Sequence, residues 1–390
     1  MPEFTRDDCD ALDEMIDGLI DYLVRAQVDR GEFAGSFWSE LAYHIPLLDY
    51  RAGGSHHNRT VGSAALAFVK CAGSSQHPDL VERAGRAFDW VVTRQHDDGG
   101  LFEITNSDRP SQFHLDYERS SISLGIVTHG MCVCMQRGLP TKDAWVRFLR
   151  RAARWQLTVE TDPGNFLHTE GYPEDKLILN ASAHAAETLL VGMAVAENRR
   201  DRINSMKGAM RAVEAVIALQ RDTGMFPYSN YEGDNSVSYT ATVAWVLQNL
   251  LDQGLLPATR GLREEVVEPI ERAARFLAEQ VTDDGSIEWE TWENHGQKYH
   301  TWVYGLMARV LAWHEGPEYR SAAMRLIRFV RRELFSEERG LPRLYDFPVG
   351  EERTICGRAV RAEGFYECAY HQADMLDCLI DTRELLAARS

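Results

Sequence analysis

The chain has 390 residues, 44% of them hydrophobic, and a formal net charge of −17. This acidic balance argues against nucleic acid or an anionic membrane as the main partner, because both require a basic surface. The sequence has no run of about 18 or more uninterrupted apolar residues, so no membrane span is expected.

The start of the chain and the cysteines bear on location and cofactors. Residues 1–8 have neither the basic segment nor the apolar segment of a secretory signal. The seven cysteines are scattered without a CxxC pair, which is typical of reduced thiols. We therefore expect a cytoplasmic protein with no cofactor and no bound metal. Its oligomeric state stays open.

Periodic apolar residues predict a series of helices. The first, at 10–27, has apolar residues that recur at spacings of three and four. The second, at 59–69, is apolar nearly all round and should be buried. This alternation continues to the end of the chain. Amphipathic helices are expected at 78–95, 142–156, 202–220, 264–280 and 318–335, and smoothly apolar ones at 120–136, 181–197, 237–253, 300–314 and 369–388.

A short phrase recurs between these helices: a Gln, a few residues rich in Asp, a Gly, and then an apolar residue. Its clearest copy is the segment 95–102, with sequence QHDDGGLF. Further copies begin at Gln27, Gln156, Gln220 and Gln280, and a sixth turn without the Gln contains Gly340. The spacing of about 60 to 70 residues predicts a repeated pair of helices.

Twelve helices of alternating character predict two layers, with the smooth helices inside and the amphipathic ones outside. Six pairs that close on themselves give an all-α (α/α)6 toroid of six helical hairpins. Such repeats bury their apolar faces only against their neighbours, so we expect one domain over residues 1–390. An open solenoid of helix pairs is the alternative.

The Gln–Asp–Gly phrase resembles the turn found in terpenoid cyclases, protein prenyltransferase β-subunits and many six-hairpin glycosidases and polysaccharide lyases. All of these are α/α toroids, so the resemblance implies the fold, which does not fix the function. It also implies a site where the loops enter the inner helices at their N-termini. Free N–H groups and partial positive charge at helix N-termini are compatible with that location.

The loops that enter the apolar helices are long and combine Trp, Tyr and His with carboxylates. This composition is typical of a sugar cleft, because aromatic faces stack on sugar rings while polar groups pair with hydroxyls. We expect a carbohydrate-active enzyme with a uronate-containing oligo- or polysaccharide as substrate. The expected substrate-binding residues are Trp38, His57, Arg59, Arg119, Tyr231, Trp289, Trp292, Arg361 and His371. The arginines would bind the substrate carboxylate.

The leading chemistry is β-elimination or C5 epimerisation at a uronic acid. Asn294-His295 and Tyr299-His300 resemble segments of alginate-lyase-like toroids, and Tyr299-His300-Thr301 resembles a stretch of glucuronyl C5-epimerases. The resemblance implies Tyr299 as base or acid, assisted by His300 and His295. Asn294 would neutralise the carboxylate.

Other functions remain open. Asp116 and Asp234 lie in two different loops and could act as the paired carboxylates of a six-hairpin glycoside hydrolase. The Arg-Gly-Asn-Gly-Trp-like stretch of unsaturated glucuronyl hydrolases is missing from the sequence. A terpenoid cyclase or prenyltransferase-like enzyme and a non-catalytic binding toroid are further alternatives.

Overall fold

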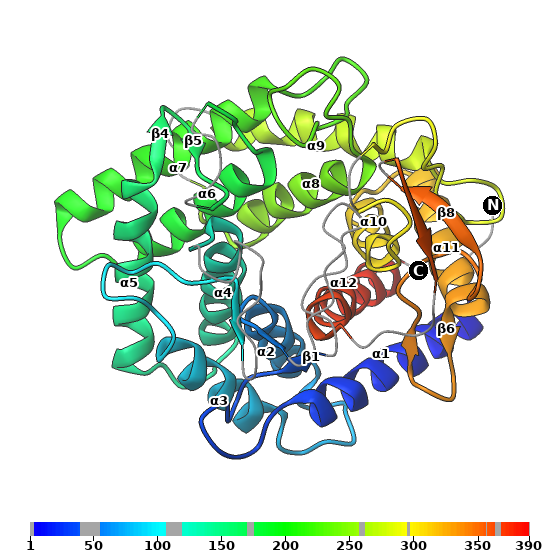
Figure 1. Ribbon diagram of the computed structural model, residues 1–390, viewed down its shortest axis with the longest axis horizontal. Helices are drawn as coiled ribbons and strands as arrows, with labels where there is room; N and C mark the ends of the chain where they lie inside the picture. Colours follow the sequence, from blue (N-terminus) through cyan, green and yellow to red (C-terminus); the bar gives the residue numbers. More distant parts are fainter. Residues whose placement is uncertain are drawn as a thin grey trace.

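The computed structural model describes residues 4–39, 55–106, 119–169, 175–256, 262–294, 297–355, 357–362 and 368–389. In these residues the chain forms twelve α-helices arranged in two concentric layers (Figure 1). The outer helices are α1 (Arg6–Ala26), α3 (Leu80–Val92), α5 (Asp143–Thr158), α7 (Arg199–Ala218), α9 (Leu262–Glu279) and α11 (Pro317–Phe329). The inner helices are α2 (Thr60–Cys71), α4 (Ser121–Gln136), α6 (Leu179–Ala194), α8 (Val237–Asp252), α10 (Trp302–Ala312) and α12 (Ala369–Ala387).

The inner helices form a closed ring. Each packs against the next in chain order, and α12, the last, packs against α2, the first. This closure confirms the (α/α)6 toroid and rules out an open solenoid. None of the described helices is long and apolar enough to cross a membrane.

Small residues let the inner helices approach closely. A Cβ built on Gly62 of α2 would lie 2.3 Å from the carbonyl oxygen of Ile126 in α4, and one built on Gly130 would lie 2.3 Å from that of Gly62. Any larger side chain at these two positions would therefore separate the helices. The inner helices are apolar on all sides because they are buried between the outer layer and the centre of the ring.

Each Gln–Asp–Gly turn follows one outer helix in the chain and packs against the next outer helix of the ring. In the fourth copy the Gln220 Nε2 donates to the carbonyl oxygen of Gly224 and to that of Pro269 in α9, both at 2.8 Å. Gly224 has φ +92°, and a Cβ built on it would lie 2.2 Å from the carbonyl oxygen of Arg272. Glycine is required here both by the backbone conformation and by the contact.

The same contact recurs around the ring. A hypothetical Cβ would lie 2.1–2.3 Å from the facing carbonyl oxygen in the pairs Gly35–Arg86, Gly99–Arg151, Gly164–Arg211, Gly224–Arg272 and Gly285–Arg325. In the first copy the contact is made by Gly35 rather than Gly31. In the sixth, Gly340 meets Gly18 of α1, since a Cβ on Gly18 would lie 2.7 Å from the Gly340 carbonyl oxygen. The last turn thus docks on the first helix.

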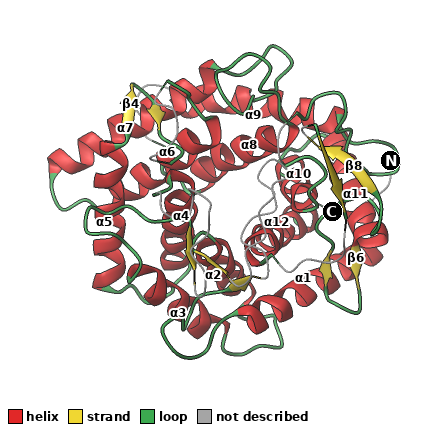
Figure 2. Ribbon diagram, viewed as in Figure 1, coloured by secondary structure: helices red, strands yellow, loops and turns green. Residues whose placement is uncertain are grey.

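Short antiparallel strands lie within the loops that connect the helices (Figure 2). They are β1 (Trp38–Ser39), β2 (Ser55–His57) and β3 (Ile104–Asn106) in one sheet, and the pairs β4 (Glu160–Asp162) with β5 (Asn165–Phe166), β6 (Phe335–Ser336) with β7 (Leu341–Pro342), and β8 (Glu352–Ile355) with β9 (Arg358–Arg361). Strands of two to four residues are too short to leave a periodic signal in the sequence.

The helices differ from the sequence expectation mainly at their ends. α11 finishes at Phe329, and residues Val330–Leu334 continue it as a π-helix, where the sequence predicted one helix to residue 335. α6 begins at Leu179, two residues before the predicted start. Such shifts arise because the final turns depend on capping and on the loops that follow.

The turn contact can be tested with a matched pair of variants. Gly224→Ala should lower the free energy of unfolding by about 2–4 kcal/mol, because alanine is strained at positive φ and its Cβ meets a backbone carbonyl. Gly138→Ala is the control, since Gly138 has φ +98° but no described atom lies within 4 Å of its added Cβ. It should lose only about 1–2 kcal/mol. Urea denaturation followed by circular dichroism measures both. Equal losses would mean that the contact does not require glycine.

Candidate active site

Cross-strand bridges pair the segments that lead into the inner helices. His57 pairs with Ile104 in the β2–β3 ladder, and His300 pairs with Tyr345. Equivalent bridges join Ser120 to Thr169 and Ile178 to Ser229. The start of each of these inner helices is therefore held by the following loop, which fixes the first side chains of the helices against one another.

Three histidines converge where α2, α10 and α12 begin. We call His57, His300 and His371, together with Tyr370 and Trp302, the histidine cluster. The ring centroids of His300 and His371 are 5.3 Å apart, and Trp302 stacks on His371 at 5.7 Å. Tyr370 lies 4.5 Å from the ring of His57. All five side chains are buried, so the cluster is a low-dielectric site in which hydrogen bonds and charges act strongly.

Gln297 fixes the hydrogen-bonding state of His300. Its Oε1 lies 2.6 Å from the Nδ1 of His300 and 3.4 Å from the indole Nε1 of Trp302. A carbonyl oxygen can only accept, so the Nδ1 of His300 carries the hydrogen. In the neutral ring the Nε2 then holds the lone pair and can act as a base.

Arg59 is held beside the cluster by α12. Its Nη2 lies 2.6 Å from the Oδ2 of Asp374, while the Ser63 hydroxyl donates to the Oδ1 of Asp374 at 2.5 Å. The guanidinium carbon sits 5.0 Å from the centre of the Tyr370 ring. Asp374 balances the charge of Arg59 and orients its guanidinium group.

A buried carboxylate lies behind His57. The Oε1 of Glu103 is 3.7 Å from the Nε2 of His57, and the hydroxyl of Ser120 hydrogen-bonds to this carboxylate. Burial lowers the pKa of His57 to about 3, with Glu103 opposing and Arg59 adding to the effect. Burial would raise the pKa of Glu103, but neighbouring positive groups and the Ser120 bond hold it below its usual value. Because burial keeps His57 neutral, Arg59, His168 and the Ser120 hydroxyl are left to hold the pKa of Glu103 below its usual value.

Tyr299 and Asn294 have contacts outside the histidine cluster. Tyr299 has φ +66°, and its hydroxyl donates to the carboxylate of Glu290. Burial, followed by Glu290, raises the pKa of Tyr299 well above its usual value, which makes its hydroxyl a poor base. The side-chain amide of Asn294 donates to the carbonyl of Gly233. His295, the remaining member of this predicted group, lies outside the described residues.

The two predicted tryptophans of the fifth loop pack within the protein. The indole of Trp289 donates to the Oδ2 of Asp346 at 2.7 Å, and the Tyr304 hydroxyl donates to the same oxygen at 2.6 Å. Burial raises the pKa of Asp346 to about 6. Trp292 packs edge-on against Phe276 of α9 at 5.7 Å. Through these contacts both tryptophans stabilise the loop.

Asp234 and Tyr231 belong to a separate polar group on the fourth loop. The Oδ2 of Asp234 lies 3.1 Å from the Nζ of Lys176, and the Ser229 hydroxyl also donates to it. Tyr231 donates to Asp175 at 3.2 Å, with Lys176 over its ring. Asp116, the predicted partner of Asp234 in hydrolysis, lies outside the described residues.

The remaining predicted binding residues are spread around the ring. Arg119 pairs with Asp98 in the second Gln–Asp–Gly turn. Arg361 is exposed in the β8–β9 hairpin, in register with Glu352. Trp38 is 40% exposed in β1 and borders a small pocket with Tyr22 and Arg25 of α1. Of the predicted residues, the structure thus brings together His57, Arg59, His300 and His371.

The groups that orient this cluster, Asp374 and Gln297, were not among the predicted site residues. Asp374 follows His371 by three residues, so both lie on one face of α12, and this spacing could have indicated their relation. Gln297 likewise precedes His300 by three residues. A similar spacing links His184 to Glu187 in α6, where the His184 Nδ1 lies 2.7 Å from a carboxylate oxygen and His129 lies 3.1 Å from the other. Burial opposes ionisation of Glu187, but these two histidines lower its pKa to about 2.

Comparisons with known proteins agree on the fold. No protein-family model matches the chain, and no curated protein matches it in sequence. Among solved structures it is similar to a cellobiose 2-epimerase from Spirochaeta thermophila, with 14% identity, 99% of each chain covered and a TM-score of 0.66. A D-mannose isomerase matches with 11% identity, 96% of this chain and 97% of that one, and a TM-score of 0.67. An unsaturated glucuronyl hydrolase specific for heparin matches with 12% identity, the same coverage, and a TM-score of 0.65. At such identities the likeness establishes the α/α toroid.

The neutral state of buried His57 predicts a specific pH dependence of stability. Unfolded histidine takes up a proton near pH 6.5, whereas folded His57 stays neutral down to about pH 3. The unfolded state therefore binds more protons between these values, and stability falls as the pH is lowered from 6.5. At pH 5 this amounts to about 2 kcal/mol, at roughly 1.4 kcal/mol per pH unit.

The variant His57→Gln removes the titrating group. Urea unfolding of the wild-type protein and the variant at pH 7 and pH 5 measures the effect. The stability lost between the two pH values should be about 2 kcal/mol smaller in the variant. Equal losses in both proteins would contradict a neutral, buried His57.

Proposed function

We propose that this protein is a carbohydrate-active enzyme that transfers a proton at the carbon next to a sugar carbonyl, giving an epimer or a ketose. The observation that carries the proposal is the pair of imidazoles, His300 and His371, 5.3 Å apart beside Arg59. Two acid–base groups on either side of one carbon can remove a proton and return it. The similarity to a cellobiose 2-epimerase and a D-mannose isomerase supports the same chemistry by analogy of fold.

The chemistry assigns a role to each group. The Nε2 of His300, whose Nδ1–H is held by Gln297, removes the proton from C2 of the open-chain sugar. The C–H electron pair forms the enediol double bond, and the carbonyl electrons move to the oxygen. Arg59 stabilises this oxyanion with its N–H groups. His371 returns a proton to the opposite face of C2 while the oxyanion electrons re-form the C1 carbonyl, which gives the epimer. For the ketose, the proton goes to C1, the O2 hydroxyl loses its proton as the C2 carbonyl forms, and the oxyanion on C1 takes up that proton.

The electrostatics of Arg59 favour a neutral sugar over a uronate. Asp374 already neutralises the guanidinium at 2.6 Å. A substrate carboxylate bound to Arg59 would also be repelled by the nearby Asp374, whereas a hydroxyl or carbonyl oxygen needs only the N–H donors. The proposal therefore keeps the proton-transfer chemistry expected from the sequence, but moves it from Tyr299 to the histidine pair and from C5 of a uronate to C2 of a neutral sugar.

Glycoside hydrolysis is the second candidate, because glycosidases and a heparin-specific unsaturated glucuronyl hydrolase share the fold. That reaction needs two carboxylates, one of them able to donate a proton. Among the described residues, Glu293 caps α8 by accepting from Ser236 and Ser238, and Asp234 is paired with Lys176. Because both carboxylates are already engaged by these partners, we favour the histidine pair as the catalytic groups over paired carboxylates.

Deuterium exchange tests the proposal. Incubating the protein in D2O with glucose, mannose, fructose or cellobiose should place deuterium at C2 of at least one sugar, detected by NMR. His300→Gln and His371→Gln should each lower kcat for this exchange by roughly 100- to 10,000-fold, the usual contribution of general acid–base catalysis. His77→Gln is the matched control, since His77 is a half-buried residue paired with Asp21 outside the cluster.

Two results would refute proton transfer at C2. One is hydrolysis of an oligosaccharide with no deuterium at carbon, which would establish the glycosidase. The other is an ultraviolet-absorbing unsaturated uronate, which would establish elimination. Full activity of both histidine variants would also rule out the pair as the acid–base groups.

A further inference from the structure

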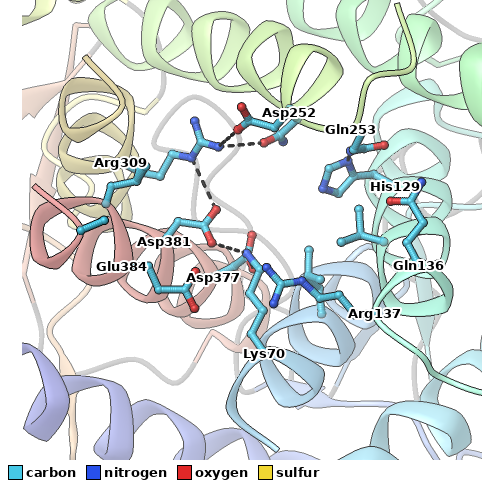
Figure 3. A pocket seen from close by; sticks show the side chains of 15 residues that line it. Lys70, His129, Gln136, Arg137, Asp252, Gln253, Arg309, Asp377, Asp381 and Glu384 are labelled. Atoms are coloured by element: carbon cyan, nitrogen blue, oxygen red, sulfur yellow. Dashed lines mark hydrogen bonds and ion pairs between the residues drawn. The ribbon is translucent and has the colours of Figure 1, made fainter. Parts of the chain in front are cut away.

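A cavity lies where the inner helices end, at the opposite side of the ring from the histidine cluster (Figure 3). Its volume is about 490 Å3, and it is lined by the final turns of α2, α4, α8, α10 and α12. This size is within the range of small-molecule sites. Leu66, Val133 and Leu385 supply apolar wall, which can contact a carbon skeleton.

Ion pairs cover one wall of this cavity. The Nζ of Lys70 lies 2.7 Å from the Oδ1 of Asp377 and 2.5 Å from the Oδ1 of Asp381. The Nη2 of Arg309 lies 2.8 Å from the Oδ2 of Asp252, and its Nε lies 3.5 Å from Asp381. The three carboxylates thus share two cations, and the wall carries an excess of negative charge.

The rest of the lining adds to this negative potential. Glu384 is exposed, lies on the α12 side of the cavity (Figure 3), and has no ion pair among the described residues. Arg137 is a further cation of the described lining, and His129, which lies 3.1 Å from Glu187, borders the cavity as well. Each of the five helices that end here contributes roughly half a negative charge from its free carbonyls. Carboxylates in final helical turns are unfavourable for the same reason, so the arrangement favours a cation.

The side-chain amide of Asn249 indicates that the ligand of this cavity also carries an oxygen that accepts a hydrogen bond. Asn249 is only 5% exposed, its Oδ1 accepts from the Nη2 of Arg309 at 3.5 Å, and its Nδ2 has no hydrogen-bond partner among the described residues. A buried donor without an acceptor is costly. A hydroxyl oxygen in the cavity would satisfy it.

We propose that this cavity binds a small organic amine that carries hydroxyl groups, the chemistry of an amino sugar. The ammonium group lies against Glu384, Asp381 and the helix carbonyls, and a hydroxyl accepts from Asn249. The site is separate from the histidine cluster and does not depend on the function proposed for it. It provides a place where an amine can bind while the other end of the ring is occupied.

Isothermal titration with D-glucosamine and D-glucose tests this assignment, because the two sugars differ only in the group at C2. The wild-type protein should bind glucosamine at least about tenfold more tightly than glucose at low salt, and the difference should shrink as salt screens the charges. Glu384→Gln should remove the difference while leaving glucose binding unchanged. Glu264→Gln, an equally exposed change on α9, should keep the difference.

A preference that arises at the histidine cluster, where C2 of the sugar lies, would be unaffected by Glu384→Gln, so this variant distinguishes the two sites. Equal affinities for glucosamine and glucose in the wild-type protein would overturn the proposal. A preference for glucosamine that survives Glu384→Gln would overturn it as well. Binding of inorganic phosphate with no binding of glucosamine would show that Lys70, Arg137 and Arg309 form an anion site instead.

Discussion

The contact between each turn glycine and a carbonyl of the next outer helix holds this structure together. At Gly224 the approach leaves no space for a Cβ, and Gln220 ties the same turn to α9 with two hydrogen bonds. The same contact recurs in five of the turns, and the sixth turn returns the chain to its start, where Gly340 meets Gly18. Closure of the ring therefore depends on a backbone contact that only glycine permits.

The closed ring explains why residues distant in sequence share one site. His57 and Arg59 enter α2, while His371 and Asp374 belong to α12, more than 300 residues later. They meet because α12 is the neighbour of α2 in the ring. The acid–base groups lie at the ends of rigid inner helices, and Gln297 and Asp374 orient His300 and Arg59. Preorganised donors of this kind are effective because they need no rearrangement when charge develops.

Much of the fold could be predicted because its signals are local. The spacing of apolar residues predicted the helices. The repeated phrase, of which Gln220–Gly224 is one copy, predicted the turns and the repeat. The short strands had too few residues to show a period. The contact in the first copy fell on Gly35 rather than Gly31 because it depends on which glycine faces Arg86, a relation that the sequence does not express.

The site was less predictable for a related physical reason. His57, Arg59, His300 and His371 were each recognisable as candidates, but which of them converge depends on ring order and on side-chain direction. Tyr299 is adjacent to His300 in sequence, yet its positive φ and its bond to Glu290 set its contacts elsewhere. Asp374 was overlooked because an acidic residue on an apolar helix has meaning only once Arg59 and Ser63 are placed against it.

The most direct test of the central claim is a crystal structure of the protein with a bound neutral sugar that reacts slowly. The account predicts that C2 of the sugar lies between His300 and His371, within about 3–3.5 Å of the Nε2 of His300, with an oxygen on Arg59. A sugar bound beside Lys176 and Asp234, with the histidine cluster unoccupied, would contradict it.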